Sequence, residues 1–127
     1  MSDYFDAGRV AELQDALGAD TEAILGSMLT SMRATIDRLE AAMAAGELDA
    51  AAQAAHRVRN DALMLSAAPL LAALTELEEA ARAGEEAGAN AALERVRLVW
   101  PPTRDALAVA CAGLGSWGRD GTEPGCE

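Results

Sequence analysis

The single histidine of this chain, His56, is the side chain best suited to act as a nucleophile at neutral pH. An imidazole with an ordinary pKa of about 6.5 is mostly neutral there, and a neutral imidazole attacks phosphoryl groups. Arg59 follows one helical turn later, where its guanidinium N–H groups can bind phosphoryl oxygens. The two residue types at this spacing predict a phosphoryl-accepting site. A solvated surface histidine beside a solvated arginine is the alternative interpretation.

A phosphoryl-accepting histidine must point away from the core of its helix. The expected helix, roughly residues 47–65, has a narrow apolar seam with spacings of three and four: Leu48, Ala51, Ala55, Val58, Ala62 and Leu65. At about 100° per residue, His56 lies about 130° from the centre of this seam, which predicts an exposed imidazole. The neighbours expected on the same surface are Ala52, Gln53, Arg59, Asn60 and Leu63.

Glycines and prolines divide the rest of the chain into helical segments joined by short turns. Apolar residues recur at helical intervals in segments at roughly residues 7–17, 21–45, 47–65, 69–83 and 90–112. Asp6 and Asp20 precede the first two segments as candidate N-caps. Pro101 and Pro102 after Trp100 remove two amide donors, so we expect a sharp kink or a break in the last helix.

Long amphipathic helices joined by short turns become antiparallel neighbours. The expected fold class is therefore all-α, an antiparallel up-and-down four-helix bundle with a short N-terminal helix across one end. We expect residues 1–112 to form this bundle, with a kink near residues 100–102. Residues 113–127 are rich in glycine and lack a periodic apolar pattern, so a C-terminal tail outside the core is expected there.

Length and charge exclude several classes of protein. The 127 residues suffice for one domain, and about a quarter of them are alanine, which favours helices over strands. Every basic residue is an arginine, and the net charge of -11 argues against binding to nucleic acid. The apolar stretches are too short to span a membrane and the N-terminus lacks a signal-peptide pattern, so we expect a cytoplasmic protein that does not bind membranes.

Cofactor and metal sites are not expected in this chain. It has no glycine-rich phosphate loop and no lysine, so it should not phosphorylate itself from ATP. One histidine without Glu-x-x-His pairs cannot build the usual di-metal site of a helical bundle. The two cysteines, Cys111 and Cys126, lack the spacing of a metal or redox motif.

Two segments carry a resemblance to a known family. They are Ala55-His56-Arg57-Val58-Arg59-Asn60-Asp61-Ala62 and Leu70-Leu71-Ala72-Ala73-Leu74-Thr75-Glu76-Leu77-Glu78-Glu79-Ala80-Ala81-Arg82-Ala83-Gly84. These segments resemble the histidine-containing phosphotransfer (HPt) domains of bacterial phosphorelays, and the resemblance covers about residues 5–112. It implies a four-helix bundle whose exposed histidine carries phosphate between the aspartates of receiver domains. These receivers belong to response regulators or to a hybrid histidine kinase.

The resemblance also implies roles for individual residues. His56 would be the phosphoacceptor, and Arg59 would stabilise the phosphoryl group where the family usually has lysine. Asn60 and Asp61 stand where the family usually has glycine and a small residue. Asn60 would then either contact the phosphoryl group or obstruct a docking receiver. The receiver would dock on the second and third helices and bring its own Mg²⁺, and the partner-binding residues would be Ala52, Gln53 and Leu63.

Two other hypotheses stay open at this point. A non-transferring relative could use the same helical face to bind or sequester a receiver or a histidine kinase, and the larger Asn60 and Asp61 favour this alternative. A purely structural helical bundle would make His56 a bystander. In either case we expect a monomer, because the chain has no spare domain for dimerisation.

Overall fold

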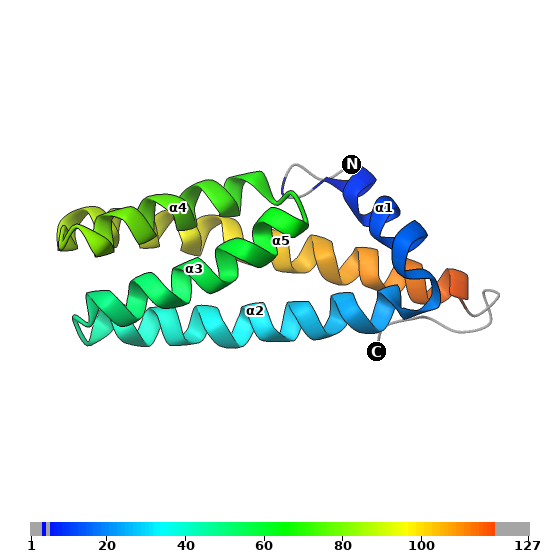
Figure 1. Cartoon of the computed structure of the whole chain (residues 1–127), viewed down its shortest axis with the longest axis horizontal. Helices are drawn as coiled ribbons and strands as arrows, with labels where there is room; N and C mark the ends of the chain where they lie inside the picture. The colour runs from blue at the N-terminus through cyan, green and yellow to red at the C-terminus, as the bar shows by residue number, and fades with distance from the viewer. Residues whose placement is uncertain (1–3, 5, 119–127) are drawn as a thin grey trace.

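The computed structural model describes residue 4 and residues 6–118, and every regular element among them is helical. The helices are α1 (Ala7–Leu17), the 3₁₀ turn η1 (Gly18–Asp20), α2 (Thr21–Ala44), α3 (Leu48–Met64), α4 (Ala68–Arg82) and α5 (Glu86–Gly118). Helices α2 to α5 run up and down in an antiparallel bundle, and α1 lies across the end where α2 begins and α3 ends (Figure 1). The predicted all-α bundle is confirmed.

Local backbone chemistry explains where the helices begin and end. The Asp6 side chain accepts a hydrogen bond from the Gly8 amide at 2.8 Å, so it caps α1 as predicted. Asp20 precedes α2 but makes no capping hydrogen bond with its side chain, because η1 leads directly into this helix. The α2–α3 and α4–α5 turns use Gly46 and Gly84, each at φ 73°, a conformation that glycine adopts without strain.

Small residues on α3 let its neighbours approach closely. Five of the six predicted seam positions are buried, and Leu48 is half-buried. Helix α3 packs against α2 on one side and α4 on the other, and larger side chains from these helices fill the core, among them Met32, Leu39, Leu70, Leu74 and Leu77. This packing fixes the rotation of α3 and therefore the direction in which His56 points.

Helix α5 differs from its predicted form. It begins at Glu86 and is helical through Pro101 and Pro102, so of the expected kink or break the break does not occur, and the kink stays a prediction. The two prolines deprive the carbonyls of Arg97 and Leu98 of their helical donors, and both residues lie on the exposed side of α5, where water can replace these donors. Residues 113–118 extend the helix into the region expected to be a tail, and residues 119–127 lie outside the described residues.

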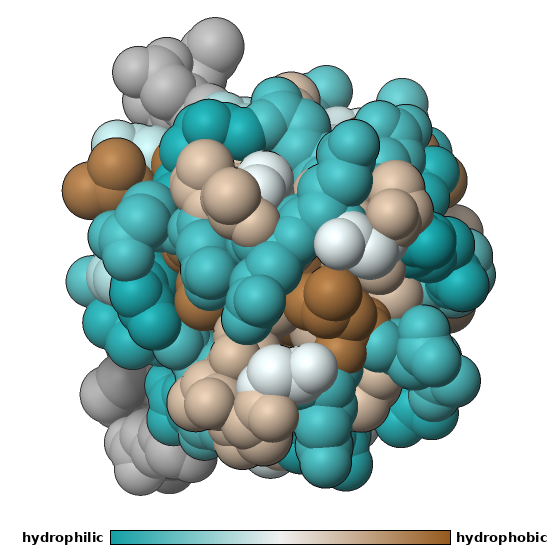
Figure 2. All heavy atoms as spheres, turned by 90° about the vertical axis from the view of Figure 1, so that its left-hand side faces the viewer, coloured by the Kyte–Doolittle hydropathy of each residue, from teal (hydrophilic) through white to brown (hydrophobic). Residues whose placement is uncertain are grey.

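One end of the described bundle has a mostly hydrophilic surface (Figure 2). Figure 2 looks onto the end formed by the α2–α3 and α4–α5 turns, where hydrophilic residues surround a small hydrophobic area. Within residue 4 and residues 6–118, no helix combines the length and the hydropathy needed to cross a bilayer.

Candidate functional site

His56 lies near the middle of α3 with its side chain 53% exposed. The flanking residues Ala55 and Val58 are fully buried, so the seam faces the core and the imidazole leaves the opposite side of the helix. The exposure predicted from the helical offset is therefore confirmed.

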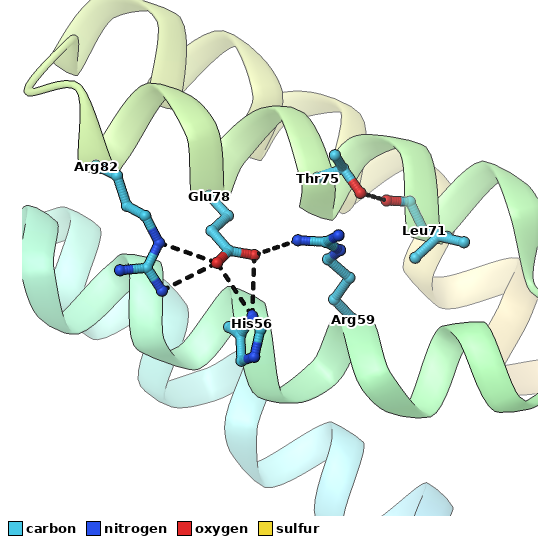
Figure 3. Close-up of polar contacts among 6 residues, drawn as sticks. All are labelled: His56, Arg59, Leu71, Thr75, Glu78 and Arg82. Atoms are coloured by element: carbon cyan, nitrogen blue, oxygen red, sulfur yellow. Dashed lines mark hydrogen bonds and ion pairs between the residues drawn. The ribbon is translucent and has the colours of Figure 1, made fainter.

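A buried carboxylate from the neighbouring helix holds the imidazole. Glu78 of α4 has a side chain only 7% exposed, and its Oε2 lies 3.1 Å from Nδ1 of His56 (Figure 3). Arg59 Nη1 donates to Oε1 of the same carboxylate at 2.8 Å, and Arg82 Nε donates to Oε2 at 3.0 Å. Three cationic or titratable side chains from two helices thus converge on one buried acid.

Glu78 is the functional candidate that the sequence interpretation missed. It occupies the apolar stripe of α4 together with the buried residues Leu74, Leu77 and Ala81. A carboxylate at such a position needs charged or hydrogen-bonding partners, because an isolated buried charge is very costly. This break in the stripe is the signal that could have identified Glu78 before the structure was known.

The surroundings of Glu78 determine its charge. Burial opposes ionisation, but the hydrogen bonds from Arg59 and Arg82 and the nearby His56 outweigh it, so the pKa of Glu78 lies below its ordinary value. An ionised carboxylate can only accept hydrogen bonds, so His56 Nδ1 must be the donor. The neutral ring then carries its lone pair on Nε2, which is turned away from Glu78 (Figure 3).

Arg59 is less free than predicted. It lies on the α4 side of His56, half-buried, and pairs with Glu78 rather than standing open to solvent. Among the described residues, the guanidinium of Arg59 donates one hydrogen bond, from Nη1 to Glu78. Its remaining N–H groups are therefore available to a ligand. The Thr75 hydroxyl near this network donates to the carbonyl of Leu71 in its own helix at 2.8 Å (Figure 3).

The structure places most of the predicted neighbours around His56 on the exposed face of α3. Gln53 and Asn60 are exposed, and Leu63 is 61% exposed. Ala52 is the exception: it is 1% exposed, so the prediction that it lies on the partner-binding surface is wrong. Its side of α3 faces α4, and a methyl side chain is too short to emerge from that contact.

Asp61 lies half-buried on the other flank of α3. Burial raises the pKa of its carboxyl above the ordinary value, and the charge of Arg57 one turn earlier opposes this rise. Ionisation of Asp61 is therefore less favourable than that of an exposed aspartate. In the part of the chain that the structure describes, no three His, Cys, Asp or Glu side chains gather in a way that could hold a metal ion.

Two comparisons with known proteins agree with this geometry. The family model described as the Hpt domain matches residues 23–114. The crystal structure of histidine-containing phosphotransfer protein B (HptB) from Pseudomonas aeruginosa PAO1 is similar in fold, with a TM-score of 0.81 and 24% sequence identity. The match covers 87% of this chain and 96% of that chain. No curated protein matches the chain.

Proposed function

Because this chain belongs to the Hpt domain family, we propose that it is a phosphorelay carrier that accepts a phosphoryl group on His56 from a receiver-domain aspartate and passes it to another receiver. One observation carries the proposal. The His56 side chain is 53% exposed and the buried, ionised Glu78 holds Nδ1, so Nε2 is the ring nitrogen whose lone pair can attack an incoming phosphoryl group.

The transfer step follows from this tautomer. The Nε2 lone pair forms the N–P bond as the P–O bond to the receiver's aspartate breaks, and that electron pair returns to the aspartate carboxylate. The ring gains positive charge while its Nδ1 proton remains hydrogen-bonded to Glu78, 3.1 Å away. The carboxylate thereby stabilises the imidazolium as it forms. The reverse steps pass the phosphoryl group to the next receiver.

Arg59 is the cation placed to stabilise the transferred group. Its guanidinium stands one turn from His56, keeps its charge at all physiological pH values and has N–H donors beyond the one held by Glu78. These donors suit the equatorial phosphoryl oxygens, which carry the negative charge during transfer. We expect Mg²⁺ to be supplied by the receiver, and we place the carrier in the cytoplasm as a monomer.

A second candidate function is a non-transferring module that binds a receiver or a histidine kinase. Asn60 favours it, since this exposed side chain shares the surface of His56, where the family usually has glycine. The half-buried, charged Asp61 on the flank adds to the departure from the family pattern. A module of this kind would bind receivers without taking label from them.

Radiolabel transfer separates the two functions. Receiver domains from the same genome, phosphorylated on aspartate with ³²P, are mixed with the wild-type chain and with His56→Gln. Carrier function predicts label on the wild type that is stable to base and labile to acid, with none on the variant. Tight receiver binding by the wild type without label in either direction would reject the carrier function and support the binding module.

A further inference from the structure

Arg82 has no part in the transfer step described above, although it binds the same carboxylate as His56 and Arg59. Its Nε donates to Oε2 of Glu78 at 3.0 Å, and its Nη2 lies 2.9 Å from the same oxygen. Arg59 donates from Nη1 to the other oxygen, Oε1, at 2.8 Å. Each carboxylate oxygen thus has a guanidinium of its own (Figure 3). This division indicates different tasks for the two arginines.

The two arginines belong to different helices. Arg82 follows Glu78 by four residues on α4, so this ion pair lies on one face of a single helix. Arg59 follows His56 by three residues on α3, and the packing of α3 against α4 brings it to Glu78. Arg82 can therefore hold Glu78 whatever Arg59 does, whereas Arg59 lies beside the ring proposed to accept the phosphoryl group.

A phosphoryl group on His56 would compete with Glu78 for Arg59. Nδ1 faces Glu78 and Nε2 is turned away from it, so the phosphoryl group would lie on the far side of the ring from the carboxylate (Figure 3). The guanidinium that now binds Oε1 must turn toward Nε2 to reach the phosphoryl oxygens. Since a phosphoryl group carries up to about two negative charges, it attracts this guanidinium more strongly than the carboxylate does.

Glu78 keeps a guanidinium when Arg59 leaves it, because Arg82 remains on Oε2. Burial raises the pKa of Glu78, and the hydrogen bonds from Arg59 and Arg82 lower it. Because the Glu78 side chain is buried, water is a poor substitute for a lost cation. Without Arg82, the carboxylate would therefore hold Arg59 back from the phosphoryl group.

From these contacts we propose that Arg82 is a positioning residue that frees Arg59 for phosphoryl transfer. In the resting protein both arginines bind Glu78. As the phosphoryl group reaches Nε2 of His56, Arg59 moves from Oε1 to the phosphoryl oxygens, while Arg82 stays on Oε2 and keeps Glu78 ionised beside Nδ1. This inference rests on the carrier function proposed above and adds a residue to its mechanism.

A double-mutant cycle with Glu78 tests this role. The measurement is the single-turnover rate of transfer from a saturating phosphorylated receiver, chosen as the one that labels the wild-type chain fastest. Arg82→Gln should slow this step about 10- to 100-fold, since Arg59 then stays on Glu78 and its hydrogen bond to the charged phosphoryl group is lost. In a Glu78→Gln background, Arg82→Gln should change the rate less than about threefold, because the amide has no charge with which to hold Arg59.

Two further variants separate positioning from a general loss of charge. Arg82→Lys should restore part of the rate, since an ammonium can also pair with Glu78 at this spacing. Arg95→Gln is the matched control and should transfer at the wild-type rate. Arg95 is about as exposed as Arg82 and pairs with Glu76 of α4, which lies about 160° around that helix from Glu78.

Nitrogen-15 spectra of the arginine side chains observe the exchange directly. The small phosphoryl donor phosphoramidate labels His56 without a receiver. On labelling, the Arg59 signals of the wild type should shift and those of Arg82 should change little, because only Arg59 changes its partner. In Arg82→Gln the shift of the Arg59 signals should be much smaller.

Four results would overturn the proposal. Wild-type transfer by Arg82→Gln would mean that Arg59 does not need to be freed. Equal slowing by Arg82→Gln in the Glu78→Gln background would mean that Arg82 acts on the phosphoryl group itself. Arg59 signals that stay unchanged when the wild type is labelled would exclude the exchange. If phosphoramidate labels the wild type but no receiver does, the carrier function fails and the proposal falls with it.

Discussion

Nδ1 of His56 lies 3.1 Å from Oε2 of Glu78. Glu78 belongs to the next helix, and its side chain is only 7% exposed. The pair joins a half-exposed imidazole to a buried acid whose charge two arginines stabilise. The packing of α3 against α4 therefore fixes the orientation of the ring and leaves Nε2 turned away from Glu78 (Figure 3).

Replacing the imidazole should remove the function and spare the fold. His56→Gln is expected to abolish phosphoryl acceptance with little change in Tm, because an exposed side chain contributes little to packing. Val58→Ala, two residues later at a fully buried seam position, should cost about 2 kcal/mol. Urea titrations and labelling assays on both variants check this contrast. An unfolded His56→Gln would show a structural role, and label retained on it would place the acceptor elsewhere.

Glu78→Gln should slow the transfer without removing the acceptor. Loss of a hydrogen bond to a charged group is worth about 1.5 to 3 kcal/mol, so the rate should fall about 10- to 100-fold. The ¹⁵N chemical shifts of His56 should report loss of the Nδ1–H tautomer, a change that destabilisation alone would not produce. Glu79→Gln on the exposed side of α4 is the control and should behave as wild type. An unchanged tautomer in Glu78→Gln would refute the positioning role.

Glu78 should also make stability depend on pH. Its pKa is lowered by folding, so its contribution is present above the ordinary value of 4.5 and is lost as the pH falls through the folded-state pKa. The difference in unfolding free energy between wild type and Glu78→Gln should therefore be larger at pH 7 than at pH 3. Urea titrations at the two pH values measure it, and an equal difference at both would contradict the ionised state assigned to Glu78.

Asp61 should have the opposite effect. Because folding raises its pKa, the unfolded chain releases this proton first, and stability falls as the pH rises above the ordinary value of 3.8. Asp61→Asn should therefore raise the unfolding free energy at pH 7 and leave it nearly unchanged at pH 3. Arg57→Gln is the converse test and should destabilise the protein at pH 7, since the charge of Arg57 favours ionised Asp61. If Asp61→Asn is less stable than the wild type at pH 7, folding lowers the pKa of Asp61 rather than raising it.

Asn60→Gly should speed transfer from a receiver several-fold. Asn60 is exposed on the surface of His56, so its side chain occupies space that a docking receiver needs. Glycine in a helix interior costs about 1 kcal/mol, so far-UV circular dichroism accompanies the rate measurement. Asn60→Ala, which keeps helix propensity, should give a smaller gain. A fall of about tenfold in both variants would instead mean that the amide donates to the phosphoryl group.

The amino-acid sequence determined those features that depend on one helix at a time. The seam of Ala51, Ala55 and Val58 predicted both the buried face of α3 and the exposure of His56, since periodicity and side-chain direction are properties of a single helix. The sequence also predicted the bundle, because amphipathic helices joined by short turns pack against each other as antiparallel neighbours.

Tertiary packing alone decided which side chains meet. Glu78 is 22 residues from His56, and its partners became known only when the rotation of α4 against α3 was fixed. The same packing buried Ala52 and paired Arg59 with Glu78. It also placed the unpaired carbonyls before Pro101 and Pro102 on the exposed side of α5, so the helix continued where a break was expected. Contacts of this kind depend on how two helices are rotated against each other, and the pattern along either helix does not contain that angle.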